Sequence, residues 1–152
     1  MSITIFSVGK KHETWIDSGV KQYQNRLRKP FNVDWVLLPH SALEGVSARQ
    51  DESERIMARV NEQDYVILLD ERGKAVDSVY VANVFQDTFT NGRRVIVIIG
   101  GAYGVDESVH QRANFVWSLS PLVFPHQLVR LILIEQIYRS QQIIAAHPYH
   151  HE

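Results

Sequence analysis

The sequence predicts an α/β fold in which a mostly parallel sheet is flanked by helices. Short runs of β-branched and apolar residues alternate with longer segments of helical periodicity along the chain. The run Val95–Ile99 (VIVII) has no polar residue, as expected of a strand that is buried on both faces. A length of 152 residues with 45% hydrophobic residues is sufficient for one domain and too short for two, so we expect residues 1–152 to form a single domain.

The first elements follow directly from residue type and spacing. Residues 3–8 are apolar or β-branched and end at Gly9, which predicts a strand followed by a turn. Residues 14–27 carry apolar side chains at helical spacing and precede Pro30, so they predict an amphipathic helix. Residues 31–38 predict the second strand.

The next stretch is more polar. Residues 41–50 contain a glycine and few apolar side chains, so we expect a mobile loop there. A helix is expected over residues 51–60, with Asp51 as a candidate cap at its positive end. Residues 65–69 predict a short buried strand, and the polar run 70–74 predicts a turn after it.

The second half continues the alternation of helices and strands. Residues 76–89 and 106–113 predict helices on either side of the Val95–Ile99 strand, and residues 115–119 predict the last strand. Two prolines exclude regular structure over residues 120–126, so we expect an ordered loop. Residues 128–145 carry apolar side chains at helical spacing and predict a long final helix.

Composition narrows the possible functions. The formal net charge of −1 excludes a strong overall positive field, so any contact with RNA would depend on local groups. The chain has no cysteine, which excludes thiolate ligands and disulfides, and we predict no metal site. No apolar stretch approaches the roughly 20 residues that cross a bilayer, so we expect a cytoplasmic protein without a membrane partner.

Three loops are candidates for a ligand site because ligands of open α/β sheets bind at the carboxyl ends of strands. These loops follow Leu69, Ile99 and Leu119. The loop after Ile99 has the form GGxxG, which lets a backbone approach a ligand closely, although a tight structural turn would explain it equally well. The proline-bracketed loop after Leu119 offers apolar walls and backbone hydrogen bonds suited to adenine; a buried connection is the alternative.

Several segments resemble, in order, the bacterial family that methylates N3 of a pseudouridine in large-subunit ribosomal RNA. The resemblance extends from one end of the chain to the other. It rests on residues 7–10 (SVGK), 98–104 (IIGGAYG), 119–130 (LSPLVFPHQLVR), 135–139 (EQIYR) and 147–150 (HPYH).

The resemblance implies a fold of the SPOUT class with a C-terminal trefoil knot, the knot and cofactor site covering roughly residues 65–152. It also implies a homodimer, S-adenosyl-L-methionine as the cofactor, and a pseudouridine in the helix 69 loop of 23S rRNA in the assembled ribosome as the substrate, with no role for DNA. By position, the implied cofactor contacts are Leu69, Gly100, Leu119, Ser120, Pro121, Leu122, Val123 and Phe124.

Four residues are candidates for the chemistry at the acceptor. The imide N3 of pseudouridine must lose a proton before it attacks a methyl group, and His126 is the candidate base or orienting group, although it could simply make a structural bond at a helix start. The fork of Arg139 suits a phosphate or a carboxylate, with a salt bridge to Glu135 or across a dimer as the alternative. Tyr149 and His150 could stack on RNA and donate hydrogen bonds to it.

Two other functions remain open from the sequence. A SPOUT methyltransferase could act on another RNA, such as a transfer RNA. A noncatalytic ribosome-assembly module is the second alternative. Binding of S-adenosyl-L-methionine separates an enzyme from such a module.

Overall fold

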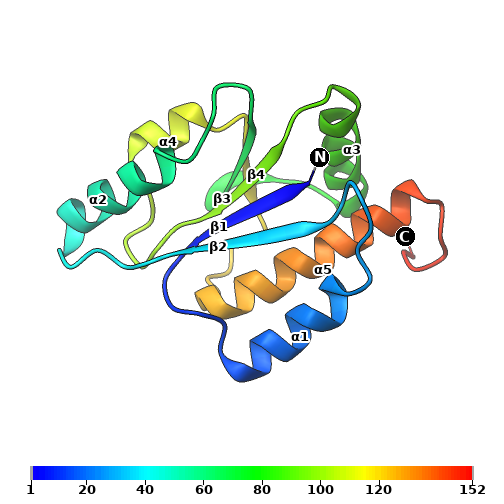
Figure 1. The fold of residues 1–152 in the computed structure, drawn as a ribbon, viewed down its shortest axis with the longest axis horizontal. Helices are drawn as coiled ribbons and strands as arrows, with labels where there is room; N and C mark the ends of the chain where they lie inside the picture. The colour runs from blue at the N-terminus through cyan, green and yellow to red at the C-terminus, as the bar shows by residue number, and fades with distance from the viewer. Residues whose placement is uncertain (1, 152) are drawn as a thin grey trace.

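A computed structural model describes residues 2–151, and within them all strands belong to one parallel sheet (Figure 1). The strands are β1 (Ile3–Val8), β2 (Val33–Leu38), β3 (Tyr65–Ala75), β4 (Val95–Ile99) and β5 (Phe115–Ser118), in the sheet order β2-β1-β4-β3-β5. The helices are α1 (Thr14–Gln24), α2 (Gly45–Met57), α3 (Ser78–Thr90), α4 (Glu107–Arg112) and α5 (His126–Ile144). The predicted α/β architecture is therefore confirmed.

Helices cover both faces of the sheet. Helices α1, α3 and α5 lie on one face, and α2 and α4 lie on the other (Figure 1). The side chains of β4 alternate between the two cores, because Val97 packs with the first helix layer while Ile96 and Ile98 pack with the second. All five residues of β4 are buried, as the apolar run predicts.

Strand register brings the predicted loops to one edge of the sheet. Ile99, the last residue of β4, is paired with Ser7 of β1 and with Leu69 of β3. Leu69 is in turn paired with Trp117 of β5. Since all these strands are parallel, the segments that follow them leave the sheet side by side.

The structure corrects the predicted end of β3. The strand does not stop at Leu69 but continues to Ala75, through the residues expected to form a turn. Its pairing with β5 shifts register between Leu69 and Lys74, so that both of these residues are paired with Trp117. The polar side chains of residues 70–74 resemble a turn in sequence, yet backbone pairing with β5 resumes beyond them.

The structure also corrects the start of α2. This helix begins at Gly45, inside the segment expected to be a loop, and Glu44 is its N-cap residue. Asp51 is therefore not a cap: it lies inside the helix, where it accepts hydrogen bonds from Ser41 and Arg55. The helix was difficult to predict because its buried face includes Glu52 and Ser53.

The remaining elements agree with the prediction to within a few residues at their ends. Helix α1 ends at Gln24 rather than Leu27, and α5 begins at His126 rather than Leu128. Within residues 2–151, no helix is both long enough and apolar enough to cross a membrane.

Candidate functional site

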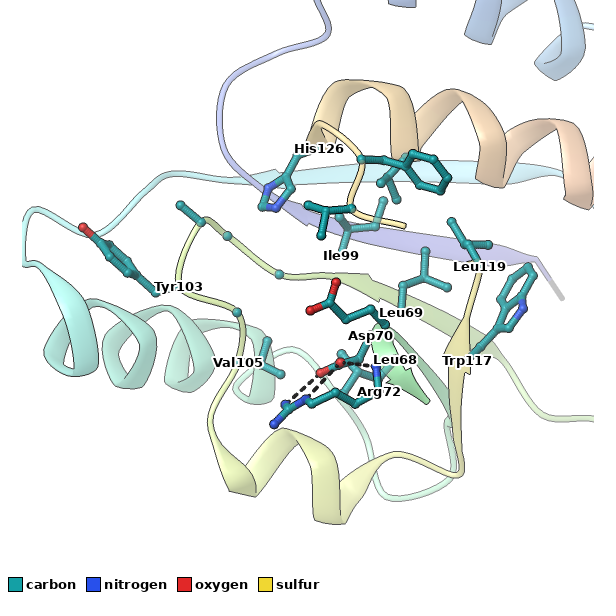
Figure 2. Close-up of a pocket in the computed structure, with 18 of the residues that line it drawn as sticks. Leu68, Leu69, Asp70, Arg72, Ile99, Tyr103, Val105, Trp117, Leu119 and His126 are labelled. Carbon is teal, nitrogen blue, oxygen red and sulfur yellow. Dashed lines mark hydrogen bonds and ion pairs between the residues drawn. The ribbon is translucent and has the colours of Figure 1, made fainter. Parts of the chain in front are cut away.

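The three predicted loops line one cavity of about 450 Å³ at the carboxyl edge of the sheet. Figure 2 shows Leu69, Ile99 and Leu119 around this cavity, which we call the strand-end cavity, with His126 at its rim. Of the residues predicted to contact a cofactor, all but Pro121 line it. Pro121 lies in the same loop, between lining residues.

Close packing explains the glycines after β4. A Cβ atom on Gly100 would lie 3.1 Å from the Val105 side chain and 3.2 Å from the Gly104 backbone. Gly104 has a φ of +72° and donates its N–H to the carbonyl of Gly101 at 3.0 Å, which closes a tight turn. The turn interpretation and a ligand-binding role are thus compatible, because the same loop lines the cavity.

Two buried residues of helix α2 contact this glycine loop. The Ser53 hydroxyl, which is fully buried, accepts the backbone N–H of Asp106 at 2.9 Å. Glu52 is 3% exposed, and its Oε1 would lie 2.6 Å from a Cβ atom on Gly101. Its other oxygen accepts the N–H of Ser41, so this buried carboxylate joins the loop after β2 to the loop after β4.

The loop between β5 and α5 forms the opposite wall. Ser120 organises it, since its carbonyl accepts from the Ser118 hydroxyl and its own hydroxyl accepts from the Leu122 N–H at 3.0 Å. Leu122 and Val123 are 68% and 82% exposed, unusually high for large apolar side chains beside a cavity.

A charged group lies on the β3 side of the cavity. Asp70 accepts hydrogen bonds from both the backbone and the guanidinium of Arg72 (Figure 2). It also lies 3.2 Å from His110 on α4. Burial alone would raise the pKa of Asp70, but these hydrogen bonds and the charge of Arg72 lower it overall. Asp70 is therefore ionised at neutral pH.

His126 lies at the start of α5 and lines the same cavity. Burial lowers its pKa, as do the charges of Arg130 and His40, while the carboxylate of Glu52 acts in the opposite direction. The positive end of the α5 dipole favours the neutral imidazole as well. His126 thus has a free ring nitrogen at neutral pH, as a proton acceptor requires.

The other three candidates form a separate cluster near the end of α5. Arg139 donates to Glu135 at 2.6 and 2.9 Å and to Nδ1 of His150 at 3.1 Å, and lies over the ring of Tyr149. The salt bridge to Glu135 that the sequence left open is present. Burial and the Glu135 carboxylate raise the pKa of Tyr149 to about 12, so this phenol remains protonated.

This tail cluster does not join His126 within one chain. Thirteen residues of helix separate His126 from Arg139, a rise of about 20 Å. His150 instead lines a second cavity of about 620 Å³ between α3 and α5, whose wall includes Trp117 and Leu119. The same two side chains line the strand-end cavity, so the two cavities share a wall.

Four charged residues beyond the predicted cofactor contacts also line the strand-end cavity. Asp70, Glu71 and Arg72 line it because β3 continues beyond Leu69, and Arg49 lines it because α2 begins earlier than expected. The charged run after Leu69 belongs to one of the three loops predicted to form the site, although none of its residues was predicted to contact the cofactor. No sequence pattern indicated that Arg49 would line the cavity.

The lining of the strand-end cavity suits a nucleoside with a charged amino-acid portion. Leu69, Leu119 and Phe124 supply apolar surface, whereas Gly100 and Gly101 expose backbone groups. Asp70 and Glu71 add carboxylates at one side. Among residues 2–151, no cluster of His, Asp and Glu has a metal-binding arrangement.

Comparisons with known proteins agree with this geometry. A family described as predicted SPOUT methyltransferase matches residues 1–150. The chain is 36% identical over 156 residues to ribosomal RNA large subunit methyltransferase H of Methylobacillus flagellatus, and each chain is covered completely. Proteins with the same name from Acetivibrio thermocellus and from Neisseria meningitidis serogroup C are 37% and 38% identical, with 99% and 100% of each chain covered. The chain therefore belongs to the SPOUT methyltransferase family.

Proposed function

We propose that this protein is an S-adenosyl-L-methionine-dependent 23S rRNA methyltransferase that modifies N3 of a pseudouridine in the helix 69 loop of assembled ribosomes in the cytoplasm. The observation that carries the proposal is the convergence of three strand-end loops on one cavity in a chain of this family. The name that the three relatives share supports large-subunit ribosomal RNA as the substrate. The particular base and atom rest on the resemblance of the sequence segments.

The strand-end cavity is the proposed site for the methyl donor. Leu69, Leu119 and Phe124 would enclose the adenosine, and the backbone around Gly100 would contact it closely. When bound, S-adenosyl-L-methionine supplies a methyl group already activated by its sulfonium. Ser120, Pro121, Leu122 and Val123 would close the wall nearest to α5.

The chain must also handle the proton of the acceptor. His126 is neutral and borders the cavity, so it is our candidate to accept the N3 proton or to orient the base by hydrogen bonding. Removing that proton creates a negative nitrogen, which the positive end of α5 and the nearby Arg130 would stabilise.

The tail cluster is the proposed contact with the RNA chain. Tyr149 has an aromatic face for stacking, and its protonated hydroxyl donates to Glu135 at 3.2 Å. Arg139 keeps its positive charge beside Glu135, and His150 faces the second cavity. A nucleotide that enters the second cavity would meet the shared wall of Trp117 and Leu119.

We further infer a homodimer and a knotted C-terminal half. Support for a dimer comes from exposed apolar side chains around the start of α5, where Trp15 is 57% exposed and Leu122 and Val123 are more exposed still. The knot rests on the family to which the chain belongs.

The deciding experiment incubates the pure protein with radiolabelled S-adenosyl-L-methionine and ribosomes that lack the modification, then maps the methylated nucleotide. We expect one labelled pseudouridine in 23S rRNA. A His126→Gln variant should bind the donor but transfer methyl groups more slowly, by a factor on the order of 10² to 10⁴.

Two other outcomes would overturn the proposal. Transfer to free transfer RNA, with ribosomes unlabelled, would indicate the alternative SPOUT activity. Failure of the pure protein to bind the donor in a calorimetric titration would indicate a noncatalytic ribosome-assembly module.

A further inference from the structure

Arg130 is a buried cation on α5 whose hydrogen bonds all go to neutral groups. Arg130 is only 1% exposed. Its guanidinium carries a positive charge, because this group remains protonated in proteins. Its Nε donates to the Ser7 hydroxyl at 3.0 Å, while Nη1 donates to the Lys10 carbonyl at 2.8 Å and to Nδ1 of His12 at 3.3 Å. Within residues 2–151, none of these acceptors is a carboxylate.

A buried charge of this kind is costly to keep. Removing a cation from water is strongly unfavourable unless a counter-charge compensates. Arg55 and Arg139 each form a salt bridge with a carboxylate on the same helix. Arg112 on α4 also donates to neutral groups, but it is only partly buried. Arg130 therefore differs from them in being both buried and electrostatically unbalanced, which is typical of groups retained for function.

The contacts of Arg130 connect α5 to the segment after β1. Ser7 is in β1, and Lys10 and His12 follow it, so one side chain holds this segment against the first turns of α5. Gly9 lies between them with a φ of +134°, and a Cβ there would lie 3.4 Å from Nη2 of Arg130 and 3.3 Å from His40. The lack of a side chain at Gly9 allows Arg130 and His40 to approach each other.

This arrangement faces His126. Residues 126 and 130 are one turn apart on α5 and hence lie on the same side of the helix. The charged and titratable groups that act on His126 are Arg130 from α5, His40 from the loop after β2, and Glu52 from α2. His12 depends on Arg130 too, because its Nδ1 must be unprotonated to accept the guanidinium N–H.

We propose that Arg130 is a positioning residue for methyl transfer, which fixes the first turn of α5 and its His126 against the segment after β1 and keeps an uncompensated positive charge behind the imidazole. The planar fork of Arg130 supplies the fixed geometry, and its charge supplies the field that favours neutral His126. The assignment of a reaction rests on the proposed function, whereas the effect on the imidazole belongs to the free protein.

Two substitutions separate geometry from charge. Arg130→Met removes both, so the pKa of His126 should rise, as measured by NMR titration of its ring proton. The acid limb of the kcat profile on ribosomes should move to higher pH, and kcat should fall by a factor on the order of 10 to 100 through misplacement of the imidazole. Arg130→Lys keeps the charge without the fork, so it should lower kcat while leaving the His126 titration close to wild type.

Arg93→Met is the matched control. Arg93 also donates to backbone carbonyls, those of Gln63 and Asp64, but lies at the opposite edge of the sheet, so its loss should leave His126 unchanged. If Arg130→Met does not fold, Ser7→Ala removes the Nε acceptor and should lower kcat at constant ribosome KM. A folded Arg130→Met protein with the wild-type His126 titration and pH profile would overturn the proposal. A raised His126 pKa without transfer by the wild type would instead refute only the proposed function.

Discussion

Gly73 lies where β3 passes closest to β5, and an added methyl group there would lie 2.6 to 2.9 Å from the backbone of Val116 and Trp117. Backbone atoms in a paired strand cannot move aside as a flexible side chain can. We expect Gly73→Ala to lower the free energy of unfolding by about 3 kcal/mol, measured by urea denaturation. Donor binding should weaken as well, because residues 70–72 line the cavity.

Gly45→Ala provides the comparison for this prediction. Gly45 has a φ of +57° with no atom within 4 Å of a built Cβ, so this substitution introduces backbone strain without a clash. Its cost should be about 1 kcal/mol. Equal losses for the two variants would contradict the steric explanation.

Two histidines contribute to the response of stability to pH near neutrality. The folded protein lowers the pKa of His126 and of His12 below the ordinary value of 6.5, mainly by burial and secondly through the charge of Arg130. Between 6.5 and the lower folded pKa, the unfolded chain binds more protons than the folded one, so stability is lost as pH falls. The melting temperature should therefore be lower at about pH 5.5 than at about pH 7.5.

A double variant tests the assignment. His12→Gln with His126→Gln removes both titrating groups, so the change in melting temperature between the two pH values should become smaller. A change as large as that of the wild type would assign the effect to other groups.

At the scale of elements, α2 holds the glycine loop in place, although Arg49 is its only residue that lines the cavity. Ser53→Ala should leave the partly buried N–H of Asp106 without its acceptor. The expected loss of unfolding free energy is about 1 to 3 kcal/mol, with weaker donor binding in a calorimetric titration. Ser47→Ala changes an exposed serine of the same helix and should have no effect on either measurement.

The fold at this scale also explains which elements could be predicted. Strand β4 was predicted to the residue because an uninterrupted apolar run has few alternatives. The start of α2 was not, because its inward face carries Ala48, Glu52 and Ser53 rather than a stripe of large apolar side chains. The extension of β3 to Ala75 could not be predicted from the side chains either, because it depends on backbone pairing with β5.

At the scale of the whole molecule, a homodimer through the surface around the start of α5 has a direct test. At this surface, Gln127 joins the start of α5 to the segment before α1, because it accepts from the Glu13 N–H and donates to the Lys11 carbonyl, close to Trp15. Trp15→Ser should shift the dimer towards monomer in light scattering at low protein concentration. Leu43→Ser removes a similarly exposed apolar side chain after β2 and should leave the oligomeric state unchanged.

The sequence alone predicts the alternation of strands and helices, the family, and the three loops that meet at the carboxyl edge of the sheet. These features are local, because apolar periodicity, glycines and prolines act through their immediate neighbours. Most residues assigned to the cofactor lie in those loops, so the strand-end cavity could be anticipated from order along the chain.

The separation of the candidate catalytic residues into two groups depends on the tertiary structure. His126 lies at one end of α5, whereas Arg139, Tyr149 and His150 gather near the other, around Glu135. The tertiary structure likewise buried Arg130 against the segment after β1, more than a hundred residues away in sequence. Such contacts depend on which strands become neighbours, and that order arises from packing of the whole sheet rather than from any local pattern.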